Sequence, residues 1–114
     1  MNAILHFCTS SDLLPTISRL LLGLAADGLE IHLACSSGAE FDALRDDGRI
    51  KCHPLEMVRA VHPLKDSLAI VEASRLIRVL QPKIVHGHHS KAGLIAMSAC
   101  LLYTSDAADE LRSV

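Results

Sequence analysis

The sequence has few aromatic residues and no excess of positive charge. It contains no Trp, one Tyr (Tyr103) and two Phe (Phe7 and Phe41), and its formal net charge is −2 at pH 7. Proteins that bind single-stranded nucleic acid stack bases on aromatic side chains, and nucleic-acid binders in general carry basic patches. Because both features are missing, we expect no nucleic-acid partner.

Long hydrophobic runs and paired cysteines are also missing. No window offers about 18 uninterrupted apolar residues, and the first eight residues (MNAILHFC) lack the charged start and long apolar core of a signal peptide. We therefore expect a cytoplasmic chain. The four cysteines lie far apart without a CxxC pair, so we expect small core residues rather than metal ligands or disulfides: Cys8, Cys35, Cys52 and Cys100.

The composition is that of a folded domain. Half of the 114 residues are hydrophobic and 21% are charged, which favours a packed unit over a disordered chain. This length accommodates one domain with a single core.

Short apolar runs alternate with segments of helical periodicity. We expect strands at residues 3–8, 30–35, 50–54 and 83–87. We expect a first helix that is capped by Asp12, has Pro15 in its first turn and ends at Gly28, and a short second helix that ends at Gly48. A third helix should run from Leu64 and end before Pro82, and a small-residue helix should begin near Lys91. This order predicts an α/β fold with a parallel, Rossmann-like sheet.

Parallel sheets bind ligands beyond the carboxyl ends of their strands. Residues 9–12, 36–38 and 86–91 follow three of the expected strands. We therefore expect these three segments to share one polar rim, where functional residues should lie.

Three stretches together carry a family resemblance: ILHFCTSSD at 4–12, SSGAEFDALRDDGRIKCHPLEMVRAVHPLKD at 36–66 and QPKIVHGHHSKAG at 81–93. Across residues 3–99 they resemble family-4-type glycosyltransferases that build bacterial surface polysaccharides. The residues that match the family pattern are Ser37, Gly38, Gly48, His53, Leu55, Met57, Arg59, Pro63, Leu64, Asp66, Pro82, Ile84, Val85, His86, His88, Lys91, Ala92 and Gly93.

The resemblance implies one half of a two-domain GT-B fold. In that fold the N-terminal Rossmann-like domain binds mainly the acceptor, and a second domain, which this sequence lacks, binds the nucleotide-sugar donor. It implies a retaining transfer to a lipid-linked or polysaccharide acceptor, with no cofactor and no tightly bound metal. The site of action would be the cytoplasmic face of the inner membrane, with peripheral contact to it, and the fragment alone would be inactive.

Candidate site residues lie on the expected rim. His88 is the candidate for catalysis and substrate contact, because an imidazole there can donate to a sugar hydroxyl or a diphosphate oxygen. Lys91 starts a helix, where the macrodipole disfavours a cation, so it needs a compensating anion such as a phosphate. Arg59 either grips an acceptor phosphate or pairs with Glu56. Ser10 and Asp12 complete the substrate-binding set.

The two histidines nearest to His88 on the expected rim, His86 and His89, are interpreted as structural. We expect His86 to bond within the sheet edge and His89 to be solvated. A zinc site made of His86, His88 and His89 is disfavoured, because three contiguous ligands cannot converge and no carboxylate or thiolate lies nearby in the sequence.

Two features depart from the family pattern. Many relatives carry a Gly-Gly pair after the first strand, whereas this chain has DLLP at 12–15, which weakens a phosphate cradle there and removes the dinucleotide-binding fingerprint. The second departure is CLLYTSDAADE at 100–110, which resembles a translated sequencing-library adapter. We therefore expect a domain at 1–99 and a non-native tail at 100–114.

Two other functions fit the same pattern. One is a stand-alone flavodoxin-like binding module, and the other is half of a nucleotide-sugar epimerase. An NAD-linked dehydrogenase is disfavoured by the missing fingerprint.

Overall fold

The computed structural model describes the backbone of residues 3–112 and the side chains of residues 3–104. Four strands form one sheet: β1 (Ala3–Cys8), β2 (Glu30–Cys35), β3 (Lys51–Pro54) and β4 (Ile84–His88). All pairings are parallel and the strand order is β3-β2-β1-β4. This arrangement confirms the predicted α/β fold with a parallel sheet.

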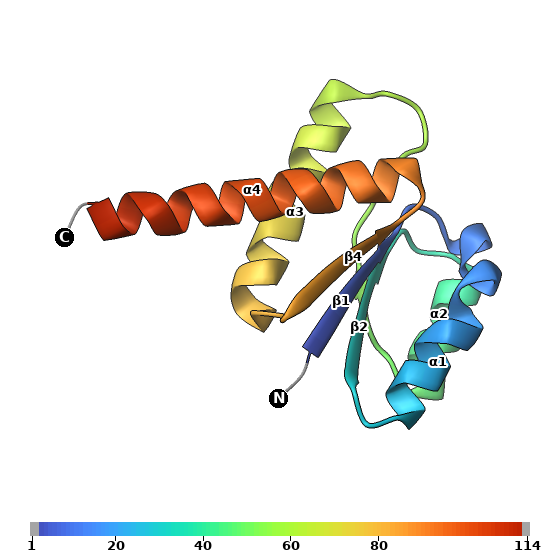
Figure 1. Ribbon diagram of the computed structural model, residues 1–114. Helices are drawn as coiled ribbons and strands as arrows, with labels where there is room; N and C mark the ends of the chain where they lie inside the picture. The colour runs from blue at the N-terminus through green and yellow to red at the C-terminus, as the bar shows by residue number, and fades with distance from the viewer. Residues whose placement is uncertain (1–2, 113–114) are drawn as a thin grey trace.

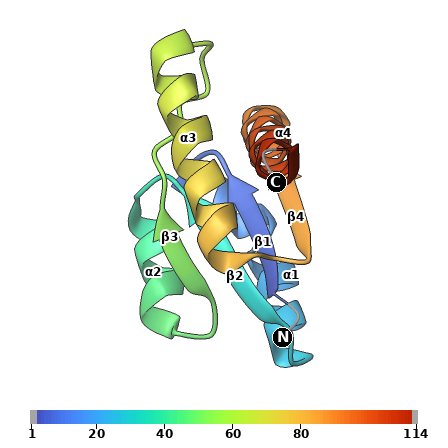
Figure 2. The ribbon, with the colours of Figure 1, turned by 90° about the vertical axis from the view of Figure 1, so that its left-hand side faces the viewer.

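Helices cover both faces of the sheet (Figures 1 and 2). On one face lie α1 (Ser18–Ala26) and α2 (Ala39–Asp47), and on the other lie α3 (Pro63–Leu80) and α4 (Ser90–Arg112). The side chains of β1 alternate between the two faces, with Leu5 and Phe7 toward α3 and α4 and Cys8 toward α1 and α2. The strand is buried on both faces, which explains its nearly continuous apolar sequence.

The first predicted helix is divided in two. A 3₁₀ helix, η1 (Ser11–Thr16), precedes α1, and Ile17 between them departs from helical geometry. Pro15 lies inside η1, where its missing N–H and its restriction of the preceding residue oppose a regular α-helix. The prediction that Asp12 caps one continuous helix is therefore wrong, because Ser10 occupies the cap position and bonds no backbone N–H through its side chain.

The end of β4 lies one residue later than predicted. The strand covers Ile84–His88, so His88 belongs to the sheet rather than to the following corner, and α4 begins at Ser90. His89 alone makes the turn, with a left-handed φ of 70°. Few residues other than glycine adopt this region, although His is among those enriched there.

The α4 helix runs through the segment predicted to be a non-native tail. It continues to Arg112, and Tyr103 packs partly against the core between the sheet and α3. Residues 105–114 of that segment lie outside the part whose side chains are described. The assignment of 100–114 as non-native stays a prediction.

Two further sequence expectations concern cysteines and membrane spans. All four cysteines are free thiols, with Cys8 and Cys35 fully buried. Among the described residues, no helix combines the length and the apolar character needed to cross a bilayer.

Candidate functional site

The carboxyl ends of three strands are joined by buried hydroxyl groups. Ser36, after β2, donates its hydroxyl to the Thr9 carbonyl at 2.7 Å and accepts the Met57 N–H at 2.8 Å. Thr9, after β1, accepts the Ala92 N–H at 3.1 Å through its own hydroxyl. These bonds bring together the segments after β1, β2 and β4, as the sequence predicted, and hold the 55–62 segment beside them.

An ion pair on this rim links η1 to the 55–62 segment. Arg59 donates to Asp12 with 2.7 Å between Nη2 and Oδ2, and the Ser10 hydroxyl donates to the other carboxylate oxygen of Asp12. The Arg59 and Asp12 side chains are 60% and 65% exposed. Three predicted site residues thus meet, and the partner of Arg59 is Asp12 rather than Glu56.

Lys91 has an anion within the chain. Its ammonium lies 2.7 Å from the Asp66 carboxylate and also donates to the Ala60 carbonyl at 2.9 Å. The side chains are only 9% and 17% exposed, and the hydrogen bond from Lys91 lowers the pKa of Asp66. The argument that Lys91 requires a ligand phosphate is therefore wrong, because Asp66 of α3 compensates the lysine at the start of α4.

A small pocket opens on the rim between η1 and the start of α4. It has a volume of about 200 Å³ and is lined by Thr9, Leu13, Arg59, His89, Ser90 and Lys91. His89, expected to be merely solvated, lies in this pocket, and its carbonyl accepts the Gly93 N–H at 2.9 Å in the first turn of α4. Arg59 and Lys91 place two cationic side chains around it.

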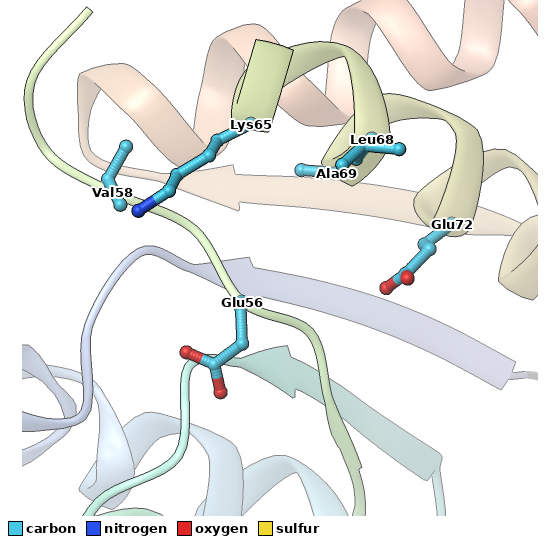
Figure 3. A pocket seen from close by; sticks show the side chains of 6 residues that line it. All are labelled: Glu56, Val58, Lys65, Leu68, Ala69 and Glu72. Atoms are coloured by element: carbon cyan, nitrogen blue, oxygen red, sulfur yellow. The ribbon is translucent and has the colours of Figure 1, made fainter. Parts of the chain in front are cut away.

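A second hollow, of about 380 Å³, lies on the other side of the 55–62 segment. Figure 3 shows Lys65, Leu68, Ala69 and Glu72 descending from α3 toward Val58 and Glu56. The lining combines three apolar side chains with charged side chains of both signs, namely Val58, Leu68 and Ala69 with Glu56, Lys65 and Glu72. No predicted site residue lines this hollow, but the 55–62 segment that borders it also carries Arg59.

The approach of α4 to β4 depends on two glycines. A Cβ at Gly87 would lie 2.5 Å from the Gly93 Cα and 2.9 Å from the Ala92 carbonyl oxygen. Backbone therefore rests directly on backbone at this point. The helix start, with Lys91, is held close to the end of β4 for this reason.

His88 points along the sheet rather than into the rim pocket. Its Nε2 lies 2.9 Å from Nδ1 of His6 on β1, and its ring stacks on His86 with centroids 4.1 Å apart. Burial, and then repulsion from His86 and His89, lowers the pKa of His88 to about 4. Burial, and then repulsion from His88 and His86, lowers the pKa of His6 to about 4. Both rings are neutral at pH 7.

A parallel sheet with helices on both faces and a polar rim at its carboxyl end defines a Rossmann-like α/β domain. The crystal structure of Acinetobacter baumannii MurG is similar, with a TM-score of 0.68 and 20% sequence identity over 90% of this chain. The chain spans 33% of the length of MurG, which is consistent with the predicted half of a GT-B fold.

The sequence also matches the pattern of a family, described as glycosyl transferase 4-like, over residues 4–106. The chain belongs to this family, and the family resemblance predicted from its motifs is confirmed. No curated protein matches the chain in sequence.

Sequence reasoning missed two residues of this region. His89 was expected only to be solvated, and it is exposed, but its lining of the rim pocket and its positive φ were not predicted. His6 was not considered because it is 82 residues from its partner His88. The parallel register, which pairs His6 with His86, would have revealed it.

Proposed function

We propose that this chain is the acceptor-side domain of a retaining glycosyltransferase. In this proposal the enzyme transfers a sugar from a nucleotide-sugar donor to a lipid-linked or polysaccharide acceptor at the cytoplasmic membrane face, in cell-surface polysaccharide synthesis. The observation that carries the proposal is the rim pocket, where Arg59, His89 and Lys91 meet at the carboxyl ends of parallel strands. Family membership supports the sugar-transfer chemistry.

Arg59 is the residue proposed to bind the acceptor phosphate. Its guanidinium is exposed, and one of its forked donors is held by Asp12, an equally exposed carboxylate. An exposed ion pair of this kind contributes little to stability, so an incoming phosphate can share or replace the carboxylate at small cost. Ser10 and Asp12 then hold Arg59 in place before the acceptor binds.

Lys91 and His88 have different roles in the proposal. Lys91 contributes positive charge to the pocket while its ammonium stays bonded to Asp66 and Ala60. His88 remains the catalytic candidate, and because its Nε2 is bonded to His6, Nδ1 is the ring nitrogen for a substrate oxygen. In this proposal the donor is bound mainly by a second domain, and the absence of a cofactor and of a tightly bound metal follows from the family resemblance alone.

The first test is activity. The 114-residue chain alone should show neither transferase nor nucleotide-sugar hydrolase activity, because groups from both domains must surround the departing diphosphate. Turnover by a clean preparation would contradict the proposal. Genomic DNA should continue in frame into a second Rossmann-like domain, whereas a stop codon near Ala99 would favour the stand-alone binding module.

The second test is acceptor binding by the chain itself, with a short-chain polyprenyl phosphate followed by NMR titration. Arg59→Ala should weaken binding about tenfold or more, as expected for loss of a charge-assisted hydrogen bond. Arg49→Ala is the matched control, because the Arg49 side chain is as exposed as that of Arg59 and pairs with Asp47 at the opposite end of the sheet. Equal affinity in the two variants would remove Arg59 from the site.

The third test needs the two-domain enzyme. His88→Ala and Lys91→Ala should each lower turnover by about a hundredfold or more if they act on developing charge. Thermal melts separate this loss from unfolding, and the Lys91 variant should melt at a lower temperature because Asp66 loses its partner. Turnover near that of the wild type in both variants would show that His88 and Lys91 have only a structural role.

A further inference from the structure

Three histidines from two adjacent strands share one face of the sheet. His6 of β1 is the register partner of His86 of β4, and His88 follows His86 by two residues on the same side of that strand. Their rings form a compact group, with centroids 5.5 Å apart for His6 and His86 and 5.1 Å apart for His6 and His88. One ring nitrogen of each lies within 4.8 Å of one ring nitrogen of each of the others.

His6 is also unsatisfied. The residue is only 2% exposed, and its Nε2 is buried with no hydrogen-bond partner, while Nδ1 faces His88. If Nδ1 carries the proton, a lone pair is buried at Nε2, and if Nε2 carries it, a buried N–H has no acceptor. Buried polar groups are nearly always paired, so this arrangement is uncommon in either tautomer.

We propose that His6, His86 and His88 bind a divalent transition-metal ion, with Zn²⁺ as the preferred ion. Neutral imidazole is a common ligand of such ions, and three imidazoles with one open position form a known type of zinc coordination. Zinc–nitrogen bonds of about 2.0–2.1 Å in tetrahedral geometry separate ligand atoms by about 3.3 Å. The 2.9 Å between His6 Nδ1 and His88 Nε2 is close to this separation.

The three ring nitrogens lie close enough together for one metal ion to replace the hydrogen bond between His6 and His88. The contact between His6 Nδ1 and His88 Nε2 is a single hydrogen bond, in which one nitrogen donates its proton and only the other offers a lone pair. A metal ion accepts a lone pair from both nitrogens. Access is provided by His86, which is exposed on the edge strand β4, while His6 anchors the site in the core.

This site differs from the one considered and disfavoured in the sequence. His89 turns away into the rim pocket, and the third ligand comes from β1, 80 residues before His86. The objection that contiguous ligands cannot converge therefore does not apply. The metal site shares His88 with the proposed catalytic site, whereas Arg59 and the rim pocket take no part in it.

The test is calorimetric titration of the tag-free chain with ZnCl₂ after treatment with EDTA. We expect saturable binding of one ion per chain in the micromolar range or tighter. His86→Gln should weaken the affinity about tenfold or more, since even residues that only support a metal ligand cost this much. His86 is exposed, so this variant should fold, and a thermal melt without metal checks that it does.

The matched control is His53→Gln on β3. His53 also belongs to a bonded histidine pair, with its Nε2 2.9 Å from Nδ1 of His32, but it lies on the opposite face of the sheet. Its replacement should leave zinc affinity unchanged. The absorption of bound Co²⁺ should have the intensity of a tetrahedral complex and decrease in His86→Gln. Binding that does not saturate, or that is lost in His53→Gln and kept in His86→Gln, would overturn the proposal.

Discussion

Replacing Gly87 with alanine should destabilise the domain through a backbone collision. The added Cβ would stand 2.5 Å from the Gly93 Cα, where ordinary contact begins at 3.4 Å. Both colliding groups are backbone, so no side chain can rotate away. The start of α4 must therefore retreat from β4 by about 0.9 Å, and we treat this displacement as overpacking.

The magnitude follows from what α4 buries. Ala92, Ile95, Ala96 and Ala99 are at most 4% exposed against the sheet and α3. A gap of about 0.5–1 Å forfeits a quarter to a half of the dispersion energy at each contact, and burial of one large side chain contributes about 1.5–3 kcal/mol. We expect a loss of about 2–3 kcal/mol, near the upper end for overpacked cores.

The partner glycine is the matched control. A Cβ at Gly93 would meet nothing nearer than the Gly87 carbonyl oxygen at 4.0 Å. Gly93 lies inside α4, where alanine is favoured over glycine by about 1 kcal/mol. Gly93→Ala should therefore be neutral or stabilising.

Urea denaturation of both variants, followed by circular dichroism, gives the two free energies of unfolding. The reasoning is refuted if Gly87→Ala lies within about 0.5 kcal/mol of the wild type, the range of ordinary surface changes. It is also refuted if Gly93→Ala is the more damaging of the two. Equal slopes against urea would confirm that the variants unfold from comparable native states.

Two further predictions concern the ends of α4. In the folded state the hydrogen bond from Lys91 lowers the pKa of Asp66 below its unfolded value of about 3.9. The Asp66–Lys91 pair therefore stabilises the fold above the unfolded pKa, and this stabilisation is lost as the pH falls through the lower, folded pKa. The urea midpoint should consequently fall between pH 6 and pH 3 more steeply in the wild type than in Lys91→Met, and parallel curves would contradict this. Truncation after Ala99 should lower the melting temperature below that of the chain truncated after Thr104, because Cys100 and Tyr103 are then lost from the core; equal melting temperatures would show that these two side chains contribute nothing.

The sheet and its rim could be predicted because the relevant signals are local. The two central strands, β1 and β2, are largely apolar runs bounded by polar residues, and the parallel order then places residues 9–12, 36–38 and 86–91 together. Besides the end of β4, the local prediction of one continuous first helix was wrong, because Pro15 does not lie in the first turn of an α-helix. It lies instead within a separate 3₁₀ helix.

The partners of the site residues could not be predicted because they come from distant parts of the chain. Lys91 bonds Asp66, Arg59 bonds Asp12 and His88 bonds His6, and these partners are 25, 47 and 82 residues away. Periodicity carries no information about such pairs. The sequence therefore identified which segments form the rim and left open whether their charges are free to meet a ligand.

The division of the core between the two faces of the sheet has a consequence for how the chain folds. Among the residues with described side chains, those of the core beneath α1 and α2 all fall within 4–52, whereas the other core extends to Tyr103. A chain emerging from the ribosome can therefore complete the first layer while the second half is still being made. The pairing of β1 with β4, which joins Ile4 to Ile84, must wait, and contacts of such long range form slowly. During this interval the apolar face of β1 with Leu5 and Phe7 is uncovered, and we expect aggregation to compete with folding most strongly then.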